Sequence, residues 1–261
     1  MKPIYEPKGK AKEYGELAIN IYTGCPHRCF YCFAPSVKHQ NKEQFHTEVK
    51  PRDGVVEAVR KQLECEQITG KLMHLCFTCD PYPTGYDTTP TREIIKLIKD
   101  SGNHVQILTK GSGLRDFDLL DENDWYGVTL DGTAGKWCNP IEYRIADLME
   151  AHKRGIKTWV SFEPVINAGG VFNCLRRVAP FIDKVKIGKL NYYPSDIEWG
   201  TFGRLIEKEC QTLHLDYYIK DSLREEMSKG TNARPIDKYH GLDAEPDYRC
   251  YIGGKDSDNE L

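Results

Sequence analysis

Cys25-Pro-His-Arg-Cys29-Phe-Tyr-Cys32 is the stretch on which the interpretation of this sequence depends. It places three cysteines in a C-x3-C-x2-C pattern. Thiolates are the usual protein ligands of iron–sulfur clusters, and a four-iron cluster ordinarily takes four of them. Three cysteines therefore hold three irons and leave the fourth open to a substrate or cofactor. Two alternatives are a zinc site completed by His27 or His39, since Cys3His is a known zinc ligand set, and inert buried thiols.

The residues before this motif predict a β-strand. Leu17-Ala-Ile-Asn-Ile-Tyr-Thr-Gly24 is a short apolar run closed by a glycine. The cysteines then follow the first strand of the fold. That is the position at which α/β barrels carry their catalytic groups.

Further along the chain, apolar runs alternate with amphipathic segments of helical length. This alternation predicts βαβ units and a parallel sheet, and we expect a partial (β/α)6 barrel of the TIM type with a short C-terminal extension. The later expected strands are 72–78, 105–110, 126–131, 157–163 and 184–188, with 215–220 as a seventh strand or an added edge. The expected helices are 54–64, 91–100, 116–122, 141–154 and 196–210.

Many of these strands end in a polar residue, and the ends of parallel strands converge on one mouth of a barrel. The polar ends are Thr23, Asp80, Lys110, Asp131, Glu163 and Lys189. Because any strand that leaves the core meets water, the set is consistent with an active site without being diagnostic of one. We divide the chain into an N-terminal arm (1–14), the barrel (15–220) and a C-terminal extension with a disordered tail (221–261).

Composition restricts the class of protein. With 261 residues, 39% hydrophobic and 29% charged, the chain suits a soluble globular protein. It has no apolar run long enough to span a membrane, and its N-terminus lacks the apolar core of a secretion signal. We therefore expect a cytoplasmic protein whose ten cysteines stay reduced. The net charge of −3 excludes a globally basic, nucleic-acid-coating surface, although a local basic patch is compatible with it.

The cysteine motif, with Tyr31 before its last cysteine, resembles the signature of the radical S-adenosylmethionine (SAM) superfamily. Four further stretches resemble the spore photoproduct lyase-like branch of that superfamily: 77–83, 107–120, 160–165 and 186–191. The resemblance covers roughly residues 15–195. It implies a 4Fe–4S cluster on Cys25, Cys29 and Cys32. It also implies SAM at the open iron and a 5′-deoxyadenosyl radical that abstracts hydrogen from a substrate, because in such enzymes the cofactor carries the chemistry.

The resemblance also suggests where SAM binds. Tyr31 is expected against the adenine, with a core aromatic as the alternative. Asp80 is expected near the methionine amino group, although an Asx turn before Pro81 explains it equally well. Polar residues at the ends of the third and fifth strands are expected at the ribose hydroxyls or the methionine carboxylate: Thr109, Lys110, Ser161 and Glu163.

Cys76 and Cys79 lie where the photoproduct lyases keep a cysteine that returns a hydrogen atom to the product radical. Here Phe77 stands just before Thr78, and this departure weakens DNA repair as the specific activity. Successive strand residues face opposite sides, and the strand is expected to end near Thr78. We therefore favour Cys79 as the donor over Cys76. The alternative is that Cys79 only packs beside the cofactor and that Cys76 belongs to the core.

The sequence as a whole predicts a radical SAM enzyme. Nucleic-acid repair or modification of the photoproduct lyase type is the first expectation for its substrate, and a flavodoxin or ferredoxin is the expected electron donor. The alternatives are radical modification of a peptide or small molecule, and a non-catalytic zinc or iron–sulfur protein.

Overall fold

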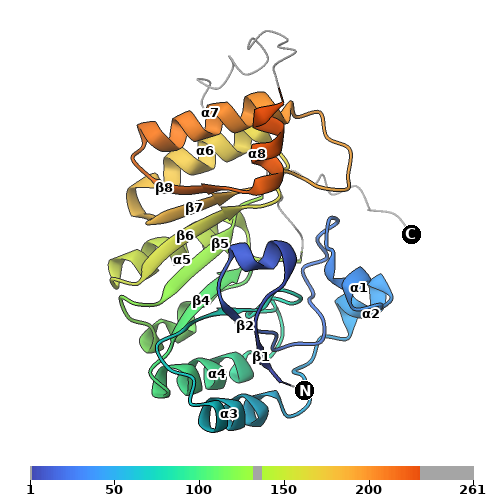
Figure 1. Cartoon of the computed structure of the whole chain (residues 1–261), viewed down its shortest axis with the longest axis vertical. Coiled ribbons are helices and arrows are strands. Elements are labelled where there is room, and N and C mark those ends of the chain that lie inside the picture. Colours follow the sequence, from blue (N-terminus) through green and yellow to red (C-terminus); the bar gives the residue numbers. More distant parts are fainter. Residues whose placement is uncertain (1, 132–136, 230–261) are drawn as a thin grey trace, which may run out of the picture.

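The computed structural model describes residues 2–131 and 137–229, and in these ranges the chain forms one curved sheet wrapped by helices (Figure 1). The sheet has eight strands in the order in which they occur along the chain, with β1 and β8 at its edges. The first strand runs antiparallel to the second, and the other seven are parallel. The expected partial barrel is confirmed, and it is open.

The expected strands are present, and each ends before its expected polar terminal residue; all are shorter than expected except β4, which keeps its length and begins one residue earlier. The strands are β1 (Ile4–Tyr5), β2 (Leu17–Ile19), β3 (Leu72–Leu75), β4 (His104–Thr109), β5 (Trp125–Thr129), β6 (Lys157–Phe162), β7 (Lys184–Ile187) and β8 (Asp216–Ile219). The segment expected as a seventh strand or an edge is both, since β8 pairs in parallel with β7 and lies at the edge of the sheet.

Helices occupy the connections between the strands. They are α1 (Ala34–Val37), α2 (Lys42–Thr47), α3 (Val55–Glu66), α4 (Thr89–Asp100), α5 (Ile141–Lys153), α6 (Ala168–Val178), α7 (Trp199–Thr212) and α8 (Asp221–Ser228), with 3-10 turns η1 (Gly9–Glu13), η2 (Leu114–Leu119) and η3 (Ala179–Phe181). The helix expected over 116–122 is the 3-10 turn η2. Helix α6 was not predicted, because two glycines in its first turn hide a helical row of apolar residues: Val171, Phe172, Leu175 and Val178.

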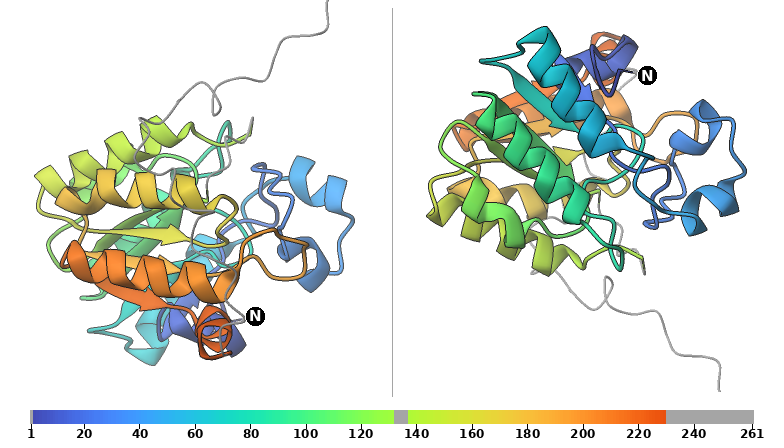
Figure 2. Two further views of the ribbon diagram at one scale, coloured as in Figure 1. Left: turned by 90° about the horizontal axis from the view of Figure 1, so that it is seen from above. Right: turned by 90° about the horizontal axis from the view of Figure 1, so that it is seen from below.

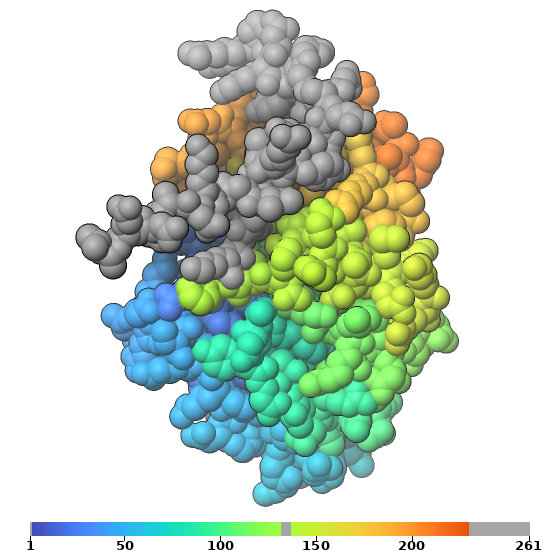
Figure 3. Space-filling model, turned by 180° about the vertical axis from the view of Figure 1, so that it is seen from behind, coloured from blue at the N-terminus to red at the C-terminus, as the bar shows by residue number. Residues whose placement is uncertain are grey.

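The two faces of the sheet differ in chemistry. On the convex face, side chains such as Ile107, Val128 and Val160 pack under the helices and form the apolar core. Figure 2 shows the helices as an outer arc around the strands, and α1 and α2 as a separate projection beside them. In the space-filling view from behind (Figure 3), the chain runs from blue segments at the bottom through green to yellow and orange segments at the top. The expected disordered tail lies outside the described residues, as does the rest of 230–261.

The concave face is instead aromatic and polar, and Trp159 fills its centre. The indole donates to the carbonyl of Ile107 at 2.9 Å and lies over Gly127 on the neighbouring strand. A Cβ at position 127 would stand 2.2 Å from the indole nitrogen, so only glycine leaves room for this ring. The interior of the barrel is therefore a packed core at this level rather than a channel.

The N-terminal arm packs against this concave face. Ile4 is buried and pairs with Ile19, and η1 lies in front of the sheet in Figure 1. Tyr14 follows η1, donates its hydroxyl to Glu163 and contacts the rings of His74 and Trp159. These contacts bury apolar surface and pair backbone groups, so the arm forms part of the domain.

One polar side chain fixes the start of the arm. The Gln62 amide accepts a hydrogen bond from the Ile4 amide at 2.9 Å and donates to the Ile4 carbonyl at 3.0 Å. Replacing Gln62 with methionine leaves both buried backbone groups unpaired. We expect a loss of about 2 kcal/mol in the free energy of unfolding, measured by urea titration. Lys61→Met, on an exposed position of the same helix, is the control and should change it by less than about 0.5 kcal/mol; equal effects would contradict this role.

Candidate active site

The three cysteines of the motif lie on one loop after β2. The loop is held from both sides: the Cys25 amide donates to the carbonyl of Phe45 at 3.2 Å, and the Cys32 amide donates to the carbonyl of Cys29 at 3.0 Å. His46 on α2 donates from Nδ1 to the Cys25 carbonyl at 2.7 Å. The following projection, α1 and α2, thus braces the loop, and all three thiols are free and half-buried.

Lysine 110, at the end of β4, brings a positive charge to this loop. Its ammonium donates to the sulfur of Cys29 at 3.4 Å, and it also bonds the Tyr31 hydroxyl and the Asp131 carboxylate. Burial lowers the pKa of Lys110, but Asp131 and the Cys29 sulfur outweigh this effect and hold the pKa above its usual value. Lys110 is therefore a fixed cation beside a candidate cluster ligand.

Tyr31 completes this group. Its hydroxyl donates to Asp131 and accepts from Lys110, and its ring centroid lies 5.1 Å from that of Phe30. Burial and the neighbouring Asp131 raise the pKa of the Tyr31 phenol well above its usual value, so the hydroxyl stays protonated. The structure thus joins Cys29, Tyr31 and Lys110, three of the predicted site residues. It adds Asp131, which was noted in the sequence only as a polar strand end.

Asp80 organises the backbone around Lys110. Its two carboxylate oxygens accept from the Tyr82 amide at 2.8 Å, the Thr109 hydroxyl at 2.5 Å and the Lys110 amide at 2.9 Å, and His27 lies 3.3 Å away. The bond to the Tyr82 amide is the Asx turn considered as its alternative role. Burial raises the pKa of Asp80, but these partners, His27 first, outweigh it and hold the pKa below its usual value.

Thr109, Ser161 and Glu163 have different surroundings. Thr109 donates to Asp80 and accepts from the Gly111 amide at 2.8 Å, so its hydroxyl is engaged in this loop. The hydroxyl of Ser161 is buried without a hydrogen-bond partner. Glu163 binds Tyr14 and, at 2.8 Å, the ammonium of Lys220. No contact in the described ranges joins Glu163 to the cysteine loop, and its role toward SAM stays a prediction.

The predicted hydrogen donor lies beyond the end of β3, which stops at Leu75 rather than Thr78. Cys76 is buried with a left-handed φ of 70°, so the chain turns there. Cys79 is half-buried, and its sulfur accepts from the Tyr22 amide at 3.4 Å. Burial raises the pKa of Cys79, but hydrogen bonds from Cys76 and the Tyr22 amide outweigh it and lower the pKa. Of the two, Cys79 is the more accessible thiol.

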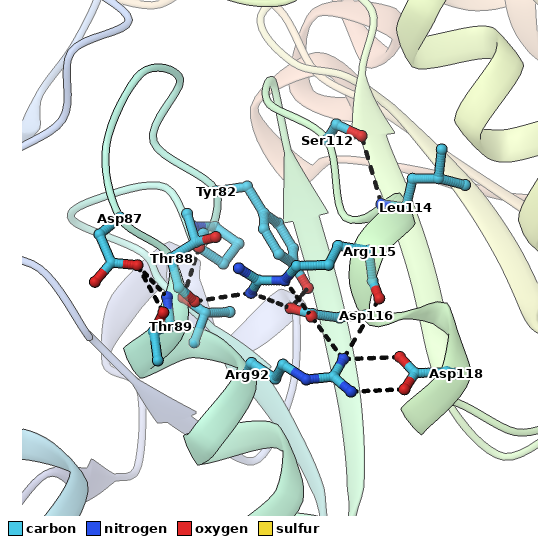
Figure 4. A network of polar contacts seen from close by, with 12 residues as sticks. Tyr82, Asp87, Thr88, Thr89, Arg92, Ser112, Leu114, Arg115, Asp116 and Asp118 are labelled. Carbon is cyan, nitrogen blue, oxygen red and sulfur yellow. Dashed lines mark hydrogen bonds and ion pairs between the residues drawn. The ribbon is translucent and has the colours of Figure 1, made fainter.

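The next loops are braced by an ion-pair network, drawn in Figure 4. Asp116 is fully buried and accepts from Arg92 at 3.0 Å, from Arg115 at 2.7 Å and from the hydroxyl of Tyr82 at 3.2 Å. Arg92 also forms a two-pronged ion pair with Asp118. The network ties the start of α4 to η2. It therefore fixes the loops after β3 and β4, which carry Asp80 and Lys110.

Exposed aromatic side chains gather at this mouth of the barrel, and we call them the aromatic rim: Phe30, Phe33, Tyr86, Trp137, Tyr192 and Tyr193. The rings of Phe30 and Tyr193 lie 5.4 Å apart, and Arg28 lies 5.1 Å from the Trp137 ring. Tyr192 is 93% exposed at a left-handed φ of 67°. Of the strongly exposed aromatic residues in the described ranges, only Tyr143 lies elsewhere, on α5. Such a concentration marks a binding surface.

Two observations disfavour a zinc ion on these cysteines. One tetrahedral zinc with Zn–S bonds of about 2.3 Å brings its sulfurs to within about 3.8 Å of one another. In the described ranges, the group of ligand atoms that lie within 4.8 Å of one another consists of His104, Asp121 and Asp124, and not of the cysteines. Both ring nitrogens of His27 are engaged, by Asp80 and by Thr84.

Comparison with known proteins identifies the family. The sequence model described as the Radical SAM superfamily matches residues 19–166, more than half of the chain. The chain belongs to the radical SAM superfamily. The described residues contain no helix long and apolar enough to cross a membrane.

Two curated relatives carry no assigned function. An uncharacterized protein of Methanocaldococcus jannaschii is 29% identical over 177 residues, or 63% of this chain and 65% of the relative. An uncharacterized protein of Mycobacterium tuberculosis is 33% identical over 112 residues, or 40% of this chain and 32% of the relative. The matched part of the chain thus spans less than two thirds of either relative.

Solved structures share the fold. A mutant of spore photoproduct lyase has a TM-score of 0.60 at 12% identity, covering 82% of this chain and 78% of the lyase. SuiB of Streptococcus suis, bound to S-adenosylmethionine, also has a TM-score of 0.60 at 12% identity, covering 86% of this chain and 56% of SuiB. A lyase mutant with bound S-adenosylmethionine and a dinucleoside spore photoproduct has a TM-score of 0.53 at 13% identity, covering 95% of this chain and 77% of the lyase.

Asp80 offers a direct test of how the site is assembled. Asp80→Ala leaves the amides of Tyr82 and Lys110 without their acceptor, so we expect a loss of more than about 2 kcal/mol in unfolding free energy at pH 7. Because the folded-state pKa of Asp80 is lowered, its contribution is complete above the unfolded value of about 3.9 and fades as the pH falls through the folded value.

The difference between wild type and Asp80→Ala should therefore be constant from about pH 5 to 7 and shrink below about pH 4. Urea titrations across this range measure it. Asp100→Ala, at the exposed end of α4, is the control. A difference that grew toward low pH would contradict the account.

Proposed function

We propose that the chain holds a 4Fe–4S cluster on Cys25, Cys29 and Cys32 and binds SAM beside it. The observation that carries this proposal is the Lys110 ammonium against the sulfur of Cys29, at the end of the sheet where barrel enzymes place their chemistry. The cluster and SAM together supply a 5′-deoxyadenosyl radical that abstracts hydrogen from a substrate. A flavodoxin or ferredoxin is proposed as the source of the electron.

The donor set fits such a cluster. The three thiols are free, sit on one braced loop and, in the described chain, are spaced too widely to surround one ion. Burial raises the pKa of Cys25 well above its usual value and that of Cys32 to about 11, so without a metal both stay protonated. Iron binding deprotonates a coordinating thiol outright. Lys110 places a positive charge beside the sulfur of Cys29.

The residues around the loop suit SAM. The Lys110 ammonium donates to the sulfur of Cys29, a proposed cluster ligand. Its positive charge complements the methionine carboxylate of SAM. Tyr31 is held in place beside Cys29 by its hydroxyl bond to Asp131, so we propose that its ring lies against the adenine, whereas a role of Ser161 toward SAM stays a prediction. Asp80 and Thr109 act by fixing the strand end that carries Lys110, since their polar atoms are already bonded to it or to each other.

For the substrate we propose a nucleic acid whose bases are unpaired, in a repair or modification reaction of the photoproduct lyase type. The aromatic rim supports this, because exposed rings stack on bases of any sequence. Charge supports it too: residues 25–52 contain five Lys or Arg residues and two Glu, a net charge of +3 in a chain of net charge −3. A local basic segment beside aromatic rings is the footprint expected for single strands.

Cluster ligation is tested one cysteine at a time. Cys25→Ala, Cys29→Ala and Cys32→Ala should each lose the iron–sulfur absorbance and SAM cleavage after anaerobic reconstitution, because each removes one ligand of three. Cys65→Ala, which replaces an exposed cysteine on α3, is the matched control and should retain both. Normal iron and sulfide content in the Cys29→Ala protein would refute the assignment.

Substrate binding is tested with a fluorescent single-stranded oligonucleotide. Tyr192→Ala should weaken binding by about 5- to 150-fold, since stacking on one aromatic is worth about 1–3 kcal/mol. Tyr143→Ala removes an exposed tyrosine from α5 and should leave the affinity unchanged. Affinity should also fall as salt rises. No salt-sensitive binding, or equal effects of the two variants, would favour a peptide or small-molecule substrate instead.

Cys79 is proposed to return a hydrogen atom to the product radical. The step breaks the Cys79 S–H bond and forms a C–H bond on the product, leaving a thiyl radical that needs one electron and one proton from the reducing system. Cys79→Ala should keep SAM cleavage but divert the product, as judged by mass spectrometry of the reacted substrate. Cys210→Ala, a buried cysteine on α7, is the control. Full yield of the normal product from Cys79→Ala would exclude this route.

A further inference from the structure

A cavity of about 720 Å³ opens at the other end of the sheet, where the parallel strands begin. The starts of β2, β3, β5 and β7 line it, and the N-terminal arm forms one wall. Because the cysteine loop follows the opposite ends of the strands, the cavity is separate from the candidate active site. Its lining includes Lys12, Tyr14, Trp159, Lys184, Lys186 and Tyr218.

Lys186 is the unusual residue of this cavity. It is only 7% exposed, and its ammonium donates to the carbonyl of Glu13 at 2.8 Å. The same nitrogen lies 4.2 Å from the ring of Tyr14 and 5.3 Å from that of Trp159. Within the described ranges Lys186 forms no ion pair with a carboxylate. A buried ammonium ordinarily requires a charged partner.

The acidic groups near the cavity are already engaged. Glu13 is paired with Lys220 at 2.8 Å, and Glu163 is paired with the same lysine. Glu16 is paired with Lys71 at 3.2 Å. Asp216 is paired with Lys184 at 2.9 Å. Glu6 also lines the cavity but is exposed, so in the described ranges none of these acids forms an ion pair with Lys186.

We propose that this cavity is a second ligand site, which binds a small anion through a phosphate or carboxylate group seated on Lys186. The bound anion is the negatively charged partner that, in the described ranges, no carboxylate of the protein provides to Lys186. Lys12 and Lys184 also line the cavity and place further positive charge near the ligand. The aromatic rings of Tyr14 and Trp159 exclude water behind it, which strengthens the charge pairing.

The protonation of Lys186 provides a specific readout. Burial first, and then the neighbouring ammonium groups of Lys220 and Lys184, lower its pKa to about 8, although Glu163 and Glu13 raise it. At pH 8 a large share of Lys186 is thus neutral and open to acetylation. A bound anion favours the charged form and covers the amine, so it should protect Lys186 from an acetylating reagent.

The test uses the full chain with pyrophosphate and succinate as probes and sodium chloride at matched ionic strength as the reference. Binding is followed by tryptophan fluorescence, since Trp125 and Trp159 both line the cavity. Protection of Lys186 is followed by mass spectrometry after acetylation. We expect saturable binding of at least one probe and at least fivefold slower labelling of Lys186. Pyrophosphate alone would identify a phosphate ligand, and succinate alone a carboxylate ligand.

Two variants make the assignment specific. Lys186→Met should weaken binding at least tenfold, and Lys184→Gln, at the more exposed part of the cavity, should weaken it about threefold even if the first variant folds poorly. Lys208→Met, on an exposed position of α7, is the control and should bind as wild type. The proposal would be overturned if neither probe changed the fluorescence or the labelling of Lys186 more than sodium chloride does. Full affinity of Lys186→Met for the probes would overturn it as well. Neither readout depends on a cluster or on SAM.

Discussion

The placement of the Lys110 ammonium beside the sulfur of Cys29 is the constraint on which the rest of the site depends. A buried lysine is costly unless it is paired, and here Asp131 and the Tyr31 hydroxyl supply the pairing. Asp80 fixes the backbone of Lys110 from behind, and His27 and Thr109 hold Asp80 in turn. The chain of bonds joins the ends of β3, β4 and β5 to the cysteine loop. Any shift of one strand end therefore shifts the cation relative to the thiols.

At the other end of the barrel, the N-terminal arm and large side chains line the second cavity. Tyr14 lies between the ammonium groups of Lys186 and Lys220, 4.2 Å and 4.6 Å from its ring centre. Trp159 fills the layer beside it because Gly127 leaves the space. A radical formed at the mouth would thus meet a packed interior on one side and the aromatic rim on the other.

Much of this fold was predictable because its signals are local. The alternation of apolar strands with amphipathic helices indicated the parallel sheet, and the spacing of Cys25, Cys29 and Cys32 indicated the metal chemistry. Helix α6 was missed because Gly169 and Gly170 lower helix propensity while tertiary packing of Phe172 and Leu175 overrides it. The packing of the N-terminal arm against the sheet was also not predicted, because the two residues of β1 are too few to show the alternation of side chains that indicates a strand.

Site roles were harder to predict, because they depend on which strand ends meet. Lys110 and Tyr31 come together across 79 residues of sequence, through contacts that no local pattern encodes. Asp80 illustrates the limit: the sequence left a cofactor ligand and an Asx turn equally open, and the structure shows the turn. In the sequence, only its position at a strand end suggested that Asp131 belongs to the site. In the structure it bonds both Tyr31 and Lys110.

The most direct test of the central claim is electron paramagnetic resonance of the anaerobically reconstituted, reduced protein, recorded with and without SAM. An open iron beside Lys110 predicts the signal of one reduced 4Fe–4S cluster, whose shape changes when SAM is added. In Lys110→Met the cluster signal should remain, while at least tenfold more SAM is needed to change it. A spectrum that SAM leaves unaltered in the wild type, or the absence of any cluster signal, would contradict the account.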